Sequence, residues 1–252
     1  MQEPVETYWR ARNNVIQMFI DRNYRMIKAE DGSPGTTEDL KNLYLSLDDF
    51  KRNYFPETMK MVGIETKDGL PVYVIMVYNY DSVPIDNADK IYSSSKASGI
   101  INDIAGDLGL KIAHDGKKTE TKLPLKEFLS MIKLVIVYNT KPKTKNRYDT
   151  SAERGFAQPE YPNIELWPVH KLQVNLARHV KVDPHFLLTD AQKQEVLDRF
   201  NANAQMLTQY TINDPLNRYY DGKPGEVYKI STNNGMAPRF AIVVARKRPE
   251  RK

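Results

Sequence analysis

Hydrophobic periodicity at the start of the chain predicts two helices. Apolar residues recur at three- and four-residue spacing over residues 5–27, which predicts one long amphipathic helix. The glycines and the proline within residues 30–39 end this pattern. A shorter helix is expected to begin near Asp48, where the side chain of Ser46 or Asp48 can accept hydrogen bonds from free backbone amides.

The next pattern along the chain is strand, helix, strand. Residues 72–80 and 134–138 are apolar runs rich in β-branched and aromatic side chains, which is typical of buried strands. Helical spacing predicts a helix over residues 97–110, and Pro124 fits the first turn of another helix over residues 125–132. This βαβ pattern predicts an α/β domain with a small sheet.

The second half of the chain begins with a predicted strand and a predicted helix. Apolar residues alternate with polar ones over residues 172–180, which favours a strand. Thr189 is a suitable N-cap for a helix that reaches Phe200, and Gln192 completes a capping-box pattern.

A short helix and a hairpin are expected to complete the second half. Asp214 and Pro215 are typical of a helix start, the acid as cap and the proline in the first turn. Residues 226–230 and 240–245 read as two strands, with turn residues 233–235 between them. The two helices can pack on this hairpin, which predicts a two-layer β/α domain.

Residues 139–163 separate the two halves. They contain three prolines, few aliphatic residues and no periodicity, which is typical of a linker. We therefore expect an N-terminal α/β domain over residues 1–140, a linker over 141–163, and a C-terminal domain over 164–252. The fold class is α/β within the first domain and α+β over the whole chain.

The net charge of +5 lies at one end of the chain. Residues 1–163 carry 23 basic and 23 acidic side chains, whereas residues 164–252 carry 14 basic and 9 acidic ones. Much of this excess is in the terminal RKRPERK segment, residues 246–252, which has the composition of a nuclear-import or phosphate-contacting patch and equally that of a solvated terminus. A stand-alone DNA-binding protein usually has a broad basic face, so we expect any contact with nucleic acid to be weak.

Composition also limits the cellular setting. About 40% of the residues are apolar and 27% are charged, which permits a globular core. Cysteine is absent, which excludes disulfides and thiolate zinc sites and fits an intracellular protein. The sequence has neither the order of a signal peptide nor an apolar run long enough to span a bilayer, so we expect no membrane association.

The sequence contains no recognisable catalytic or cofactor motif. The four histidines have neither HxxxH nor HExxH spacing, so we expect structural roles for them and no metal site: His114, His170, His179 and His185. Phosphate-binding glycine motifs and a Gly-x-Ser-x-Gly elbow are absent from the sequence as well. We therefore expect no catalytic residue and no cofactor.

One group of charged residues leaves a nuclease open as an alternative. Glu65 and Lys67, with Asp49 and Asp68 nearby, have the residue types of a nuclease that holds Mg²⁺ with carboxylates and stabilises the attacked phosphate with a lysine. Glu65 and Lys67 precede the apolar run instead of lying in a strand after the first acid, which favours exposed loop charges. A nuclease-like DNA-binding protein therefore remains the alternative.

The second half resembles a known family. Val182, Pro184 and His185 are followed by the capped helix, and then by the run Asp214-Pro-Leu-Asn-Arg-Tyr-Tyr-Asp-Gly-Lys-Pro-Gly-Glu-Val-Tyr-Lys-Ile230. This order over about 50 residues resembles the assembly domain of the fifth-largest subunit shared by eukaryotic nuclear RNA polymerases, which has a smaller archaeal equivalent.

The first half is similar to the same eukaryotic subunit, more loosely. Residues 8–11 (YWRA) open a long helix that reaches residues 21–24 (DRNY), and residues 47–51 (LDDFK) follow, as in the N-terminal jaw domain of that family, which the archaeal equivalent lacks. The loop 231–237 and Thr208 depart from the family pattern, and extra residues occur near 30–44, in the linker and in the tail. These departures indicate a divergent version of the subunit, from a eukaryote or a virus.

The resemblance implies a non-catalytic structural subunit of a multi-subunit DNA-dependent RNA polymerase. The C-terminal domain would dock on the largest polymerase subunit among the other core subunits, and the jaw domain would lie near downstream double-stranded DNA. The chain would not form a homo-oligomer. Its location would be the nucleus, or a cytoplasmic virus factory and the virion if it is viral. A free module that competes for a polymerase site is a further alternative.

Residues for both contacts follow from the resemblance and the charge pattern. The expected docking residues come from the 214–230 motif: Asp214, Pro215, Tyr219, Gly222, Gly225, Val227 and Ile230. The expected DNA-proximal residues are basic and lie in the first helix: Arg10, Arg12 and Arg22.

Overall fold

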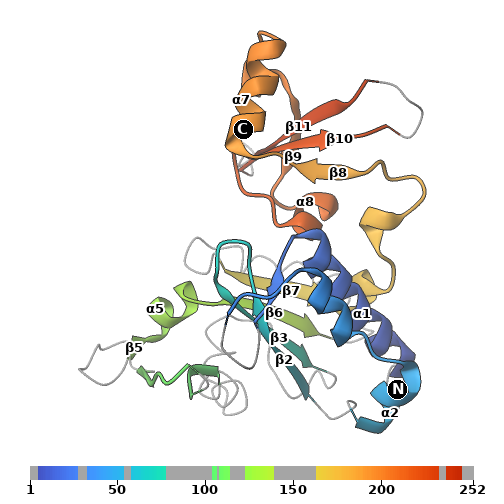
Figure 1. Ribbon diagram of the computed structural model, residues 1–252, viewed down its shortest axis with the longest axis vertical. Coiled ribbons are helices and arrows are strands. Elements are labelled where there is room, and N and C mark those ends of the chain that lie inside the picture. Colours follow the sequence, from blue (N-terminus) through green and yellow to red (C-terminus); the bar gives the residue numbers. More distant parts are fainter. Residues whose placement is uncertain are drawn as a thin grey trace, which may run out of the picture. The chain divides into compact units, whose positions relative to one another are not determined.

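The chain divides into two compact units, Met1–Gln173 and Val174–Lys252 (Figure 1). The computed structural model describes residues 5–27, 33–53, 58–77, 104–106, 108–113, 123–138, 163–232 and 237–245. Within these ranges, every helix is too short or too polar to cross a membrane.

The first unit combines helices with a five-stranded sheet. Its elements in chain order are α1 (Val5–Asp21), β1 (Arg25–Met26), the 3-10 helix η1 (Glu38–Leu43), α2 (Leu47–Asn53), β2 (Thr58–Glu65), β3 (Pro71–Val77), β4 (Ile112–Ala113), β5 (Leu123–Pro124), α5 (Leu125–Ser130), β6 (Lys133–Tyr138), β7 (Ile164–Pro168) and the 3-10 helix η3 (Val169–Leu172). The sheet has the order β1-β2-β3-β6-β7, and β4 pairs with β5 separately.

The predicted βαβ arrangement is confirmed. β3 and β6 pair in parallel, with Val72 opposite Lys133 and Val77 opposite Tyr138, and β7 continues the parallel order beside β6. β1, β2 and β3 pair antiparallel to one another. Both faces of β6 are buried along its whole length, which explains why this strand appears in the sequence as an uninterrupted apolar run.

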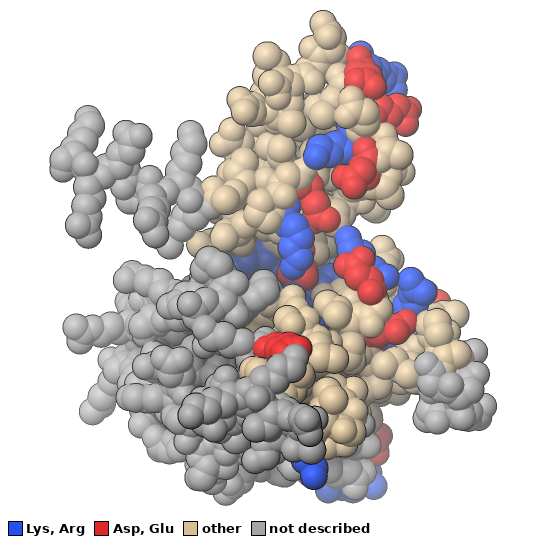
Figure 2. Space-filling view, turned by 90° about the vertical axis from the view of Figure 1, so that its left-hand side faces the viewer, with Lys and Arg blue, Asp and Glu red and all other residues tan. Residues whose placement is uncertain are grey.

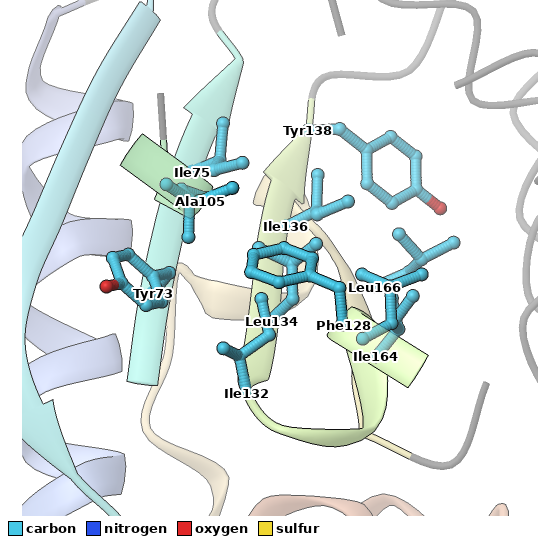
Figure 3. Close-up of a cluster of buried hydrophobic side chains, with 12 residues drawn as sticks. Tyr73, Ile75, Ala105, Phe128, Ile132, Leu134, Ile136, Tyr138, Ile164 and Leu166 are labelled. Carbon is cyan, nitrogen blue, oxygen red and sulfur yellow. The ribbon is translucent and has the colours of Figure 1, made fainter. Parts of the chain in front are cut away.

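The core on one face of this sheet comes from three neighbouring strands and the helices that connect them. Figure 3 shows Phe128 of α5 and Ala105 lying over side chains of β3, β6 and β7. The strand residues in this cluster alternate along each strand, as expected for one face of a pleated sheet: Tyr73, Ile75, Leu134, Ile136, Tyr138, Ile164 and Leu166.

The first helix is shorter than predicted. It ends at Asp21, and Asn23 then takes the left-handed conformation with φ 58°, which commonly ends a helix. Tyr24 still continues the apolar stripe because its ring stacks on Phe19 at 5.2 Å between centroids. Arg25 and Met26 leave the helix to pair with β2.

The other predicted helices of the first unit fit to different degrees. α2 begins at Leu47, and Ser46 Oγ accepts a hydrogen bond from the Asp49 amide at 3.1 Å, as predicted. Of the helix expected over 97–110, residues 104–106 are helical and residues 108–109 form a turn, while the remainder of its N-terminal part lies outside the described residues. β2 was not predicted, and neither was the short β1.

The second unit is a four-stranded sheet with two helices. Its elements are the 3-10 helix η4 (Leu176–Arg178), β8 (His185–Leu187), α7 (Asp190–Arg199), the 3-10 helix η5 (Ala204–Met206), β9 (Thr208–Thr211), α8 (Pro215–Tyr220), β10 (Val227–Ile230) and β11 (Arg239–Val244). The strand order is β8-β10-β11-β9, with β9 parallel to β11 and the other pairs antiparallel. The predicted hairpin, β10 and β11, forms the centre of this sheet, although its turn residues 233–235 lie outside the described residues.

Two predictions near the unit boundary differ from the structure. The strand expected over 172–180 is wrong, because this segment contains 3-10 turns instead. Asn175 Oδ1 accepts a hydrogen bond from the Arg178 amide at 3.2 Å, a local bond of the kind that competes with a strand ladder. The boundary itself falls after Gln173 and not at 163/164, because β7 pairs with β6 and so belongs to the first unit. Of the predicted linker, residues 141–162 lie outside the described residues.

Candidate interaction surfaces

The start of the 214–230 motif builds a capped helix. Asp214 Oδ1 accepts hydrogen bonds from the backbone amides of Leu216 and Asn217 at 2.9 and 3.4 Å, and Pro215 occupies the first turn of α8. The helix carries Tyr219, which is buried and whose hydroxyl accepts a hydrogen bond from Asn175 Nδ2 at 3.0 Å. Of these motif residues, Pro215 is exposed.

The middle of the motif is a close-packed turn around Gly222. Asn217 Nδ2 donates to the Gly222 carbonyl at 3.1 Å, and the Tyr228 hydroxyl donates to Asn217 Oδ1 at 2.9 Å. A Cβ on Gly222 would lie 2.2 Å from the Tyr228 hydroxyl oxygen and 2.3 Å from Asn217 Oδ1. The motif therefore requires glycine here because no side chain fits.

The end of the motif closes the sheet. Gly225 has φ +93°, in the left-handed region that favours glycine, and its carbonyl accepts a hydrogen bond from Lys193 Nζ at 2.8 Å. Val227 and Ile230 are buried in β10. Six of the seven predicted docking residues thus have a structural role inside the second unit, and Pro215 presents an exposed side chain.

His185 of β8 lies in a cluster of aromatic rings. Its ring centroid is 5.8 Å from that of Tyr210, 6.3 Å from Tyr220 and 6.0 Å from Tyr228. Nδ1 lies 2.6 Å from the carbonyl oxygen of Asp183, which can only accept, so the neutral ring donates from Nδ1 and accepts from the Tyr210 hydroxyl at Nε2, 3.1 Å away. Burial lowers the pKa of His185, and this outweighs the Asp183 carbonyl and the Asp214 carboxylate, which raise it. The arrangement is that of a neutral, structural histidine.

Two of the three arginines predicted near DNA are buried inside the first unit. Arg12 donates to the Leu43 carbonyl at 2.5 Å, which ties α1 to η1. Arg22 forms a two-pronged ion pair with Glu165, with both N–O distances at 2.9 Å. Arg10 is exposed on α1 and pairs with Glu6 one turn away at 3.4 Å.

Glu165 is the centre of a buried charge network that the sequence analysis missed. Besides Arg22, it accepts hydrogen bonds from Lys133 Nζ at 2.7 Å and from Trp167 Nε1 at 2.9 Å. Burial raises the pKa of Glu165, but the charges and hydrogen bonds of Arg22 and Lys133 lower it more, so it lies well below its usual value. Arg22 and Glu165 are 143 positions apart, and no local pattern signals such a pair.

The residues of the nuclease alternative do not converge. Glu65 ends β2, and Lys67 and Asp68 lie exposed in the turn to β3. Asp49 lies in α2, where its Oδ2 accepts a hydrogen bond from Ser46 Oγ at 2.6 Å. Across the part of the chain that the structure describes, His, Asp and Glu residues form no group of three suited to a metal ion.

Surface charge is mixed on the face that Figure 2 shows. In Figure 2, Lys and Arg of the described residues lie beside Asp and Glu and not in a region of their own. His170 and His179 are exposed, whereas His114 and the basic tail, residues 246–252, lie outside the described residues. The described surface in this view therefore lacks the broad basic face of a stand-alone DNA-binding protein.

Most of the second unit matches a known family domain. Residues 174–242 match the family RNA polymerase Rpb5, C-terminal domain. The predicted resemblance is confirmed. The Rpb5 match begins at the first residue of the second unit and ends within β11, so the predicted family motif lies inside both the match and the observed unit.

Curated relatives carry related names. A Dictyostelium discoideum protein, "DNA-directed RNA polymerases I, II, and III subunit rpabc1", is 34% identical over 85 residues, which cover 34% of this chain and 43% of the relative. An African swine fever virus protein, "DNA-directed RNA polymerase RPB5 homolog", is 28% identical over 193 residues, 75% of this chain and 90% of the relative. A Caenorhabditis elegans protein, "DNA-directed RNA polymerases I, II, and III subunit RPABC1", is 25% identical over 240 residues, 94% of this chain and 95% of the relative.

These Rpb5 similarities extend beyond the second unit. The viral and nematode matches are too long to lie within residues 174–252, so they include part of the first unit as well. None of these names refers to a nuclease.

Proposed function

We propose that this protein is a structural, non-catalytic subunit of a multi-subunit DNA-dependent RNA polymerase. The observation that carries the proposal is the match of residues 174–242 to the Rpb5 C-terminal domain, on a unit with its own sheet and core. The similarity to a viral polymerase subunit over 75% of this chain, and to a nematode subunit over 94% of it, supports the same role for the two units together.

The second unit is the docking domain in this proposal, with the largest polymerase subunit as its partner. The 214–230 motif maintains the shape of this domain, since Asp214 caps α8 and Gly222 permits the close turn beside Tyr228. Pro215 is the predicted docking residue with an exposed side chain, and the half-buried Asp214 and Gly225 are candidates for direct contact beside it. Nucleotide addition would then belong to the large subunits, and this chain needs no catalytic acid of its own.

The first unit is the jaw domain near downstream double-stranded DNA. Its contact with DNA is weak in this proposal, because the basic and acidic side chains of residues 1–163 balance. Arg10 remains a candidate for such a contact, since Arg12 and Arg22 are buried in intramolecular contacts. The location would be the nucleus in a eukaryotic host, or a virus factory and the virion for a viral enzyme.

Affinity purification of the tagged full-length chain tests the proposal. We expect the two largest polymerase subunits to co-purify, together with an activity that incorporates ribonucleotides on a DNA template. A chain purified from the same cells without polymerase subunits would contradict the proposal, whatever activity it had by itself.

A further inference from the structure

The strands β8, β10 and β11 lie side by side in the C-terminal sheet (Figure 1). One face of these three strands carries a row of large side chains. Phe186 of β8 and Phe240 of β11 both lie directly opposite Lys229 of β10. Directly opposed residues on adjacent strands point to the same face. Phe186 is 55% exposed, Lys229 is exposed and Phe240 is half-buried.

Phe200 extends this row beyond β11. It directly follows α7, is 59% exposed, and its ring centroid lies 5.9 Å from that of Phe240. The guanidinium of Arg199 lies 6.0 Å from the Phe200 ring centroid. We call Phe186, Lys229, Phe240 and Phe200 the phenylalanine row.

The main buried cluster of the second unit lies on the opposite face, with Tyr220 of α8 packed against it: Tyr228, Ile230, Ala241 and Val243. On the row's own face, the paired residues Val227 and Ile242 are buried, whereas Phe186, Lys229 and Phe200 are exposed. An exposed group of large apolar side chains on a soluble domain typically marks an interaction site. Aromatic residues and arginine are also the types enriched at protein interfaces.

We propose that the phenylalanine row is the surface through which the second unit docks on the polymerase. Its occupant is a protein segment with an apolar side chain that packs between the rings and a carboxylate that pairs with Lys229. This inference rests on the proposed function.

Charge argues for the carboxylate and against a nucleic acid. A partner that covers Phe186 and Phe240 also covers the ammonium group of Lys229 between them, and a buried charge is costly unless it is paired. Residues 174–245 carry eight basic and seven acidic side chains. This unit therefore lacks the excess of positive charge with which proteins bind the phosphate backbone of a single strand.

The test uses the tagged full-length protein and variants of the row. We expect the double variant Phe186→Ala/Phe200→Ala to recover at least about tenfold less of the two largest polymerase subunits per chain than the wild type. Lys229→Glu should lose recovery too, because it places a second acid against the partner's carboxylate. The matched controls Val180→Ala and Lys181→Glu, also exposed on this unit, should recover as much as the wild type.

Thermal unfolding of each variant checks that the variant is still folded. We expect unfolding temperatures close to that of the wild type, because exposed side chains can be truncated without loss of the fold. Full recovery of polymerase by both row variants would overturn the docking surface and leave the polymerase assignment standing. Failure of the wild type itself to recover polymerase would overturn both.

Two further measurements separate other occupants. If the wild type bound a fluorescein-labelled single-stranded oligonucleotide and the double variant lost only this binding, the row would be a nucleic-acid surface and the proposal would be wrong. A wild-type dimer that the double variant converts to monomers in sedimentation, with polymerase recovery intact, would assign the row to a second copy and also overturn it.

Discussion

Gly222 lies where the second unit has no room for a side chain. A Cβ there would meet the Tyr228 hydroxyl and Asn217 Oδ1, and the buried hydrogen bond between them would have to break. We expect Gly222→Ala to lower the free energy of unfolding of this unit by about 3 kcal/mol, from overpacking and the lost bond. Hydrogen exchange of the β10 and β11 amides measures this loss.

Gly106→Ala, in the first unit, is the control for a glycine-to-alanine change without a clash, because a Cβ at Gly106 meets nothing within 4 Å. It should leave these exchange rates unchanged. Equal exchange rates for the two alanine variants would show that the turn can accommodate a Cβ. The close packing around Gly222 would then contribute nothing to the stability of the second unit.

Among the charged residues of the first unit, Glu165 is the one whose substitution we expect to lower the stability of this unit most. Glu165→Gln removes the anion that pairs with two buried cations, Arg22 and Lys133. Loss of one partner of a buried ion pair typically costs about 3–5 kcal/mol. Urea unfolding of the first unit should show this loss, whereas Glu6→Gln, in the exposed pair with Arg10, should change stability by less than about 0.5 kcal/mol.

The pKa of Glu165 adds a pH dependence to the same comparison. Since its folded-state pKa lies well below the unfolded value of about 4.3, the unfolded chain takes up the proton first as pH falls. The stabilisation is therefore complete above about pH 4.3 and is lost as pH falls toward the folded pKa. The stability difference between wild type and Glu165→Gln should shrink below about pH 4, and a constant difference would contradict this cause.

For single residues, the sequence predicted interactions with partners a few positions away better than interactions with partners far along the chain. The caps at Ser46, Thr189 and Asp214 depend on residues two or three positions away and were predicted. Arg22 was predicted to lie near DNA, and its partner Glu165 was missed because Glu165 lies in a strand that joins the sheet only in the fold.

At the scale of elements, α8 depends on its cap. Asp214→Ala removes the acceptor for two backbone amides and should lower the stability of the second unit by about 1 kcal/mol. Asp214→Asn retains a side-chain oxygen and should cost much less. Thermal unfolding checks the pair, and equal losses for both variants would mean that the carboxylate charge, and not the cap, matters.

The helices and strands that the sequence predicted are those that are long or that begin with a capping residue. α7 carries the predicted capping box between Thr189 and Gln192, and β3 and β6 are long buried runs. β8 and β9 have only three and four residues, and β9 is mostly exposed, so neither contains a readable alternation. The arrangement of these two strands at the sheet edges comes from long-range pairing with the hairpin.

At the scale of the whole molecule, the unit boundary has a direct consequence. The second unit has its own core, so we expect residues 174–252 to unfold cooperatively as an isolated fragment. A fragment that starts at residue 164 carries Ile164, Leu166 and Trp167, which are buried in the first unit and would be exposed. It should therefore aggregate more in analytical ultracentrifugation, and equal behaviour of the two fragments would contradict the boundary.

The family resemblance was predictable from the sequence, and the surface that we propose for docking was not. The 214–230 motif is recognisable because its spacing builds a cap, a tight turn and a buried strand. The phenylalanine row is assembled from β8, β10, β11 and the end of α7, and its members are brought together only by strand register and ring packing.

The measurement that tests the central claim most directly is the molar ratio of this chain to the largest polymerase subunit in the gradient fraction that synthesises RNA, without any tag. A structural subunit predicts a ratio of one to one that persists through the peak of activity. A ratio well below one would favour a free module that competes for a polymerase site. Absence of the chain from the active fraction would contradict the account.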